Sequence, residues 1–262
     1  MTLSAMGSWL VSFTPFFFLC LMLPAFLAGN NDPAKTKRKV IELAIPVTMI
    51  FAWILLVDIL QNLSDQQAAY SQTTLILWTV LVGAGIYGGA SLISVTPQPK
   101  ALFVSRQSAK PLWAACLFII GLLVTMGVSN VYAGSFISFE ALGLYWVLIS
   151  IAFLRLRKQR GHVSVEMMAR SCLTVGKVIL GISYLWMLLD LNDPSRIGGA
   201  LAVGVVGSTY SLLAYCLLTM LKPLFQSIPS PKEKVHLNMG RFFWTHLLLV
   251  AAHVTLVFFV VS

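Results

Sequence analysis

The sequence predicts an all-α membrane protein with about eight transmembrane helices. Hydrophobic residues make up 58% of its 262 residues and charged residues only 10%. A water-soluble domain would carry about 25% charged residues, so the bilayer rather than water sets the architecture. Eight apolar runs each approach the roughly 20 residues that a helix needs to cross the hydrocarbon layer. They cover 8–28, 41–61, 72–94, 112–131, 137–154, 172–190, 198–221 and 242–261.

The basic residues lie on alternate connections between these runs. Of the 18 Lys and Arg residues, all but Arg196 fall on one face if Lys177 extends toward the same side. Because Lys and Arg concentrate in cytoplasmic loops, this pattern predicts a multi-pass protein of the bacterial inner membrane with both termini in the periplasm. The net charge of +9 follows from these loops and does not indicate nucleic-acid binding. The basic connections are 29–40, 97–110, 155–170 and 222–241.

The short connections leave no room for a soluble catalytic domain. No phosphate-binding loop, zinc-protease motif or serine-hydrolase motif occurs in the sequence, so we expect neither enzymatic activity nor a cofactor. The cysteines lack zinc-ligand spacing and lie inside apolar runs, which indicates small buried residues rather than metal ligands. They are Cys20, Cys116, Cys172 and Cys216.

The two halves of the chain resemble each other. Each half would hold four helices in the same orientation, which predicts tandem parallel four-helix repeats about an axis along the membrane normal. The alternative is the general likeness of apolar helices. The repeat divides the chain into 1–109 (helices one to three), 110–225 (helices four to seven) and 226–262 (a cytoplasmic loop and helix eight). The matching stretches are 6–28 with 133–155, 53–66 with 186–196, and 110–129 with 240–262.

Hydroxyl groups occur near the middle of the apolar run at 198–221. The charged turn Asp193–Arg196 precedes the run, and Ser208, Thr209, Tyr210 and Ser211 follow within it. In hydrocarbon, a Ser or Thr hydroxyl can bond to a carbonyl one turn earlier or across a helix interface. Small residues at nearby positions allow two helices to approach closely, and they are Gly198, Gly199, Gly204 and Gly207.

The stretch 191–215 also resembles a known family. Its Asp-Pro-Ser-x-Ile-Gly turn is followed by Ala-Leu-Ala-Val, Gly-Ser-Thr-Tyr and Leu-Leu-Ala-Tyr, and this order is similar to the last two transmembrane helices of the MotA/TolQ/ExbB family. Residues 133–154 are similar to the family's second helix. Residues 110–225 thus resemble one four-helix unit, although the family's Gly-Thr-Val-x-Gly signature is replaced by GKVILGISYLW. Its long cytoplasmic insert is reduced to 155–170, so the usual rotor contact is not expected.

The resemblance implies a function. The chain would be a subunit, in an oligomer, that assembles with a single-span MotB- or ExbD-like protein and couples proton or sodium flow to work in a cell-envelope motor. Ser208, Thr209 and Tyr210 would then lie on the ion pathway beside a carboxylate of the partner. Two alternatives stay open: a structural or accessory subunit without ion conduction, and a small secondary transporter with parallel repeats.

Four ionisable residues are further candidates for the ion pathway. Glu140 and Asp190 lie near the outer ends of predicted spans, where they are either solvated helix ends or functional intramembrane charges. His246 and His253 are seven residues apart and share a helical face. Such a pair could relay protons or form hydrogen bonds between helices.

Overall fold

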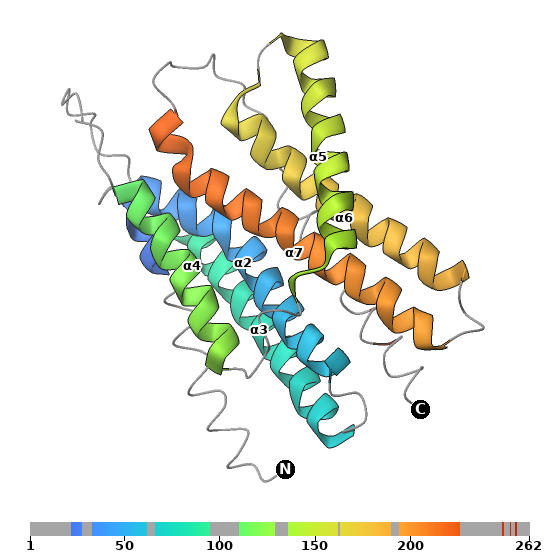
Figure 1. The fold of residues 1–262 in the computed structure, drawn as a ribbon. Helices are drawn as coiled ribbons and strands as arrows, with labels where there is room; N and C mark the ends of the chain where they lie inside the picture. The colour runs from blue at the N-terminus through green and yellow to red at the C-terminus, as the bar shows by residue number, and fades with distance from the viewer. Residues whose placement is uncertain are drawn as a thin grey trace, which may run out of the picture.

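The structure is a computed structural model. It describes residues 22–27, 33–61, 66–94, 110–128, 136–161, 163–189 and 194–225, together with residues 248, 252 and 255. In this part of the chain the regular structure is helical throughout (Figure 1). The long helices are α2 (Pro33–Gln61), α3 (Gln66–Leu92), α4 (Lys110–Val128), α5 (Phe139–Arg160), α6 (Val165–Leu189) and α7 (Pro194–Phe225).

Helices α2 to α7 correspond to the second to seventh predicted apolar runs. Five of them are long and apolar enough to cross a membrane, whereas the apolar part of α4, Lys110–Val124, is shorter. The runs at 8–28 and 242–261 lie mostly outside the described residues, so the count of eight spans stays a prediction. The five spans are Pro33–Val57, Leu75–Leu92, Phe139–Gln159, Val165–Leu189 and Gly199–Phe225.

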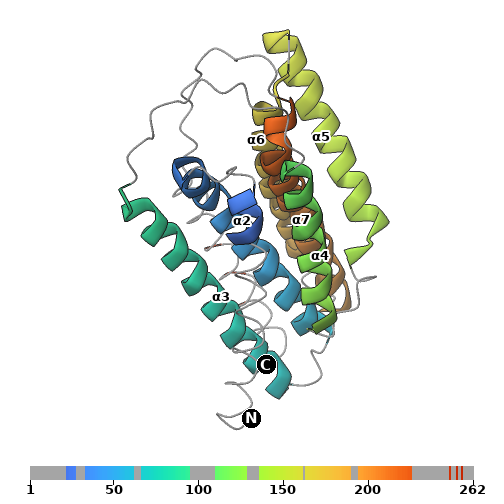
Figure 2. The same ribbon diagram turned by 90° about the vertical axis from the view of Figure 1, so that its left-hand side faces the viewer.

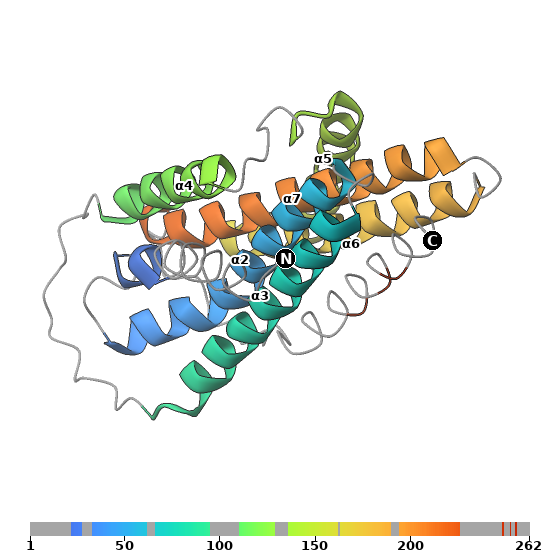
Figure 3. The ribbon, with the colours of Figure 1, turned by 90° about the horizontal axis from the view of Figure 1, so that it is seen from below.

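Helices α2 and α7 form the centre of the described fold. The order across the molecule is α3, α2, α7 and α6, each packed on the next, with α4 against α7 and α5 against both α6 and α7 (Figures 2 and 3). Every residue from Leu43 to Val57 on α2 is buried, and a helix that is apolar on all sides belongs in such a central position. By contrast, α5 exposes large apolar side chains such as Phe139, Trp146 and Leu154, which fit contact with lipid.

The helices extend further into the basic connections than the hydropathy pattern predicts. Helix α5 continues through Arg160 and ends at Gly161, whose φ of 72° is left-handed and whose amide donates to the Arg157 carbonyl (2.9 Å). Ser164 then accepts a hydrogen bond from the Met167 amide (3.3 Å) and begins α6. The connection expected at 155–170 is therefore only 161–164, because Arg and Lys favour the helix as well as most apolar residues do.

Two other helix starts also differ from the sequence prediction. Helix α2 begins at Pro33 rather than at 41, so that Lys35 to Lys39 are helical. Helix α7 begins at Pro194, and the predicted turn Asp193–Arg196 is thus wrong in all but its first residue, which lies outside the described part. Proline is favoured at the first position of a helix because its missing N–H has no helical acceptor there.

The packing does not itself show the predicted parallel repeat. That repeat pairs α2 with α6 and α3 with α7, so a two-fold axis would pack α3 on α6 just as α2 packs on α7. The α2–α7 contact is extensive, but α3 and α6 are not among the closely packed pairs of described helices. The repeat and the three-part division of the chain therefore remain predictions from the sequence.

Helices α2 and α3 approach each other closely at Gly83. A Cβ on Gly83 would lie 2.6 Å from Thr48 Cγ2 and 2.8 Å from Thr48 Cβ. Thr48 is fully buried, and its hydroxyl donates to the Ala44 carbonyl (2.6 Å), which fixes its side chain. A glycine is therefore required on α3 at this crossing.

Gly83→Ala should lower the stability of the protein by about 1–3 kcal/mol, the usual cost of overpacking. The thermal unfolding midpoint of the detergent-solubilised chain measures this. The control is Gly85→Ala, because a Cβ at Gly85 meets nothing within 4 Å. This control should keep or slightly raise the midpoint, since alanine favours the helix. Equal midpoints for the two variants would contradict the close α2–α3 crossing.

Candidate functional site

Helices α6 and α7 form an antiparallel hairpin held together by small residues. Gly204 on α7 faces Ser183 on α6, whose side chain occupies the space that a Cβ on Gly204 would need. The Ser183 hydroxyl donates to the Ala200 carbonyl across the interface (2.6 Å). A Cβ on Gly207 would lie 2.7 Å from Ile179 Cγ2. Small residues at these positions let the two backbones approach, as in many membrane helix pairs.

The same hairpin encloses the hydroxyl segment of α7. Ser208 and Ser211 are fully buried, and a Cβ on Gly176 of α6 would lie 3.0 Å from Ser211 Cβ and 3.6 Å from Ser208 Oγ. Ser211 donates to the Gly207 carbonyl (3.2 Å), and Thr209 donates to the Val205 carbonyl (2.8 Å). Ser208 Oγ has no hydrogen-bond partner among the described residues.

Tyr210 connects the hydroxyl segment to the start of α5. Its hydroxyl donates to the Phe136 carbonyl and accepts from the Ser138 amide (3.3 Å). Ser138 is also the N-cap of α5 and accepts from the Ala141 amide (3.2 Å). These bonds satisfy backbone groups that precede the helix, which is necessary wherever such groups lie at membrane depth.

The contact with α7 determines the level of Glu140 along that helix. A Cβ on Gly207 would lie 3.7 Å from Ala141 Cβ, so the first turn of α5 is level with Gly207. The apolar span of α7 begins at Gly199, and eight residues of helix correspond to about 12 Å. Glu140 therefore lies about 12 Å along α7 from Gly199, and it is the second residue of the apolar stretch of α5, Phe139–Gln159. Its exposed side chain makes no ion pair with any residue in the described part of the chain.

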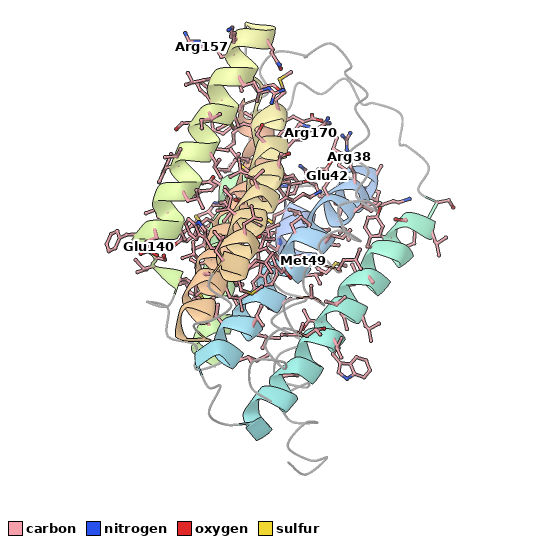
Figure 4. The ribbon with its side chains drawn as sticks, turned by 90° about the vertical axis from the view of Figure 1, so that its right-hand side faces the viewer. Arg38, Glu42, Met49, Glu140, Arg157 and Arg170 are labelled. Atoms are coloured by element: carbon pink, nitrogen blue, oxygen red, sulfur yellow. The ribbon has the colours of Figure 1, made fainter. Side chains whose placement is uncertain are left out.

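Glu140 is unusual because it is an exposed carboxylate level with Gly207 of α7. It lies at the end of α5 opposite Arg157 (Figure 4), on a helix whose exposed face is apolar. A charge at membrane depth is costly, and such residues commonly belong to ion pathways or bind partners. The hydropathy of 137–154 alone predicts that Glu140 lies near the outer end of that span.

The remaining predicted site residues divide into two groups. Gly199 has nothing within 4 Å of a Cβ built on it, so no contact within the described chain requires a glycine there. Gly198 lies in α7, but its surroundings are outside the described part. Asp190, His246 and His253 lie outside the described residues altogether.

A second polar site, which the sequence reasoning did not identify, lies at the basic end of the bundle. Glu42 on α2 pairs with Arg38 (2.9 Å) and Lys39 (3.2 Å). Glu166 on α6 pairs with Arg170 and with Lys222 on α7 (2.5 Å for Lys222). The spacing of three or four residues within α2 and α6 is visible in the sequence, but it brings side chains together only on a helix. The hydropathy pattern alone predicts loops at these residues.

Comparisons with known proteins found no relative: no protein-family model, curated protein or solved structure matches this chain. The fold defines only a class, an all-α membrane-embedded protein. The resemblance of 133–154 and 191–215 to the MotA/TolQ/ExbB family stays an expectation from the sequence, and none of these comparisons identifies that family.

Tyr210→Phe should loosen the start of α5, because it removes the hydroxyl that bonds to Phe136 and Ser138. We expect a loss of about 0.5–1.5 kcal/mol, the usual net value of a hydrogen bond, and faster amide hydrogen exchange in the first turn of α5. Tyr87→Phe is the matched control, because it lies on α3, which is not among the helices that pack closely on α5. Unchanged exchange in α5 would refute this anchoring role of Tyr210.

Glu166→Gln should destabilise the bundle, because it removes the carboxylate that joins α6 to α7. The side chains are partly buried, so we expect about 1–3 kcal/mol, between the values for exposed and buried ion pairs. Glu140→Gln is the matched control, since Glu140 also lies in the first turn of its helix but makes no ion pair among the described residues. Thermal unfolding should show a lower midpoint for Glu166→Gln only.

Proposed function

We propose that this chain is a MotA/TolQ/ExbB-like subunit of the bacterial inner membrane. It assembles with single-span partner helices and couples proton or sodium flow to work in a cell-envelope motor. The observation that carries this proposal is the position of Glu140, an exposed carboxylate in the first turn of α5, level with Gly207 of α7.

The surroundings of Glu140 support an ion-handling role. Tyr210 and Ser138 bring hydroxyl groups to the first turn of α5, and a carboxylate near hydroxyls and water can bind and release a proton or a sodium ion. Glu140 would then act on the surface that a partner helix covers, with Tyr210 as a positioning residue.

The antiparallel α6–α7 hairpin limits what the hydroxyl segment contributes to this proposal. In the resemblance, the segment with Ser208 and Thr209 contacts the partner's carboxylate. In the isolated chain both residues are buried, so this contact requires the partner to move α7 relative to a neighbouring helix. Glu140 needs no such movement because its side chain is already exposed.

A second candidate is a structural or accessory subunit that conducts no ions. It is favoured by the hydrogen bonds of Thr209 and Ser211, whose hydroxyls bond to carbonyls of their own helix. In this case the hydroxyl segment contributes only to helix packing.

Ion flux through the complex distinguishes the two candidates. The tagged chain is purified with its partners from the native membrane, its composition is determined by native mass spectrometry, and proton and sodium uptake are measured in vesicles. Glu140→Gln should reduce uptake at least tenfold without loss of partners, because a neutral amide cannot exchange a proton or balance a cation. Glu140→Asp should restore part of the uptake.

Two outcomes would overturn the ion-coupling proposal. One is a complex that takes up neither ion although all its partners are present, which would favour the structural candidate. The other is equal uptake by wild type and Glu140→Gln, which would place the ion pathway elsewhere.

A further inference from the structure

The charged residues at the basic end of the bundle form one cluster across three helices. We define the basic cluster as Arg38, Lys39 and Glu42 on α2, Glu166 and Arg170 on α6, and Lys222 on α7. Lys39 Nζ donates to the Thr219 carbonyl of α7 (2.7 Å), and the Tyr215 hydroxyl of α7 lies 3.5 Å from the Glu42 carbonyl oxygen that accepts from it. Figure 4 shows Arg38, Glu42 and Arg170 close together at this end.

The basic cluster contains more positive than negative charge. Each of its two carboxylates is shared by two cations: Arg38 and Lys39 contact Glu42, and Arg170 and Lys222 contact Glu166. Among the six described residues of the cluster, four cations face two carboxylates, so these six residues carry two more positive than negative charges. Lys39 and Lys222 are also close enough to repel each other.

The excess charge is partly withdrawn from solvent. The side chains of Lys39 and Lys222 are only 12% and 17% exposed, whereas that of Arg38 is 71% exposed. Repulsion between like charges grows as the local dielectric constant falls, so an external anion would stabilise this arrangement. The exposed Arg38 guanidinium gives that anion access, and its planar donors match the oxygens of a phosphate group.

The basic cluster also lies near the ends of candidate membrane spans. Lys39 is six residues into the α2 span, which begins at Pro33, and Lys222 is three residues before the end of the α7 span. The predicted topology places this end at the cytoplasmic surface, where anionic lipids attract basic side chains. The relevant chemistry is therefore a phosphate-type anion, from either a lipid headgroup or free phosphate.

We propose that the basic cluster binds a phosphate-type anion between α2, α6 and α7, with Arg38 as its exposed ligand. Binding offsets the excess positive charge and holds the three helix ends together. This site is separate from Glu140 and does not depend on the ion-coupling function.

The test measures lipid binding to the full-length chain by native mass spectrometry. The protein in neutral detergent is titrated with phosphatidylglycerol, and separately with zwitterionic phosphatidylcholine. Wild type should bind one phosphatidylglycerol in preference to phosphatidylcholine, and Arg38→Gln should weaken that binding about fivefold, the equivalent of one basic residue near an anionic surface. Arg38 is exposed, so this variant should fold normally.

Arg157→Gln is the matched control, because Arg157 is an exposed arginine near the basic end of α5, outside the basic cluster. It should bind phosphatidylglycerol as wild type does. A parallel titration with inorganic phosphate identifies the source of the anion: tight binding that Arg38→Gln weakens would assign the site to free phosphate, and its absence would assign the site to the lipid. Equal loss in the Arg38 and Arg157 variants, or no preference for either anion, would overturn the proposal.

Discussion

The close approach of α6 and α7 is the constraint on which the rest of the described structure depends. In a membrane no hydrophobic force drives two apolar helices together, so packing and interhelical hydrogen bonds must hold them. Gly176, Gly204 and Gly207 provide the space, and Ser183 provides a hydrogen bond to the Ala200 carbonyl. With one side of α7 fixed in this way, its other sides receive α2, α4 and α5.

The position of α5 follows from that arrangement and gives Glu140 its significance. Tyr210 satisfies the backbone of Phe136 and Ser138, and Gly207 lies beside Ala141. These contacts hold the start of α5 beside the middle of α7 rather than beside its first turn, so that the carboxylate in the first turn of α5 is level with Gly207. On the side of α7 that faces α6, Ser208 and Ser211 are buried beside Gly176. The structure of α7 is therefore compatible both with an ion pathway and with a purely structural hydroxyl segment. The two proposals differ in the role that they give to Glu140.

The basic ends of the helices show a different kind of constraint. In the described part of the chain, many of the Lys and Arg residues that predict the cytoplasmic side lie on helical extensions, where carboxylates of α2 and α6 pair with some of them. Lys222 reaches Glu166 across 56 residues of sequence and so joins the two ends of the hairpin. Some of the basic residues that predict the topology therefore also form the ion pairs between helices. Their role in the topology explains why cations outnumber carboxylates in this partly buried cluster.

The sequence by itself determined the all-helical membrane class, the positions of the central six apolar runs and the concentration of basic residues at one end, because hydropathy and charge are properties of local segments. It also indicated the glycines at 204 and 207 and the back-bonded hydroxyls of Thr209 and Ser211. Only the tertiary structure decided the level of Glu140 along α7, the close contact between Gly83 and Thr48, and the pairing of Glu166 with Lys222. Each of these depends on the offset between neighbouring helices, which is set by side-chain packing between distant segments and has no signature in the periodicity of a single helix.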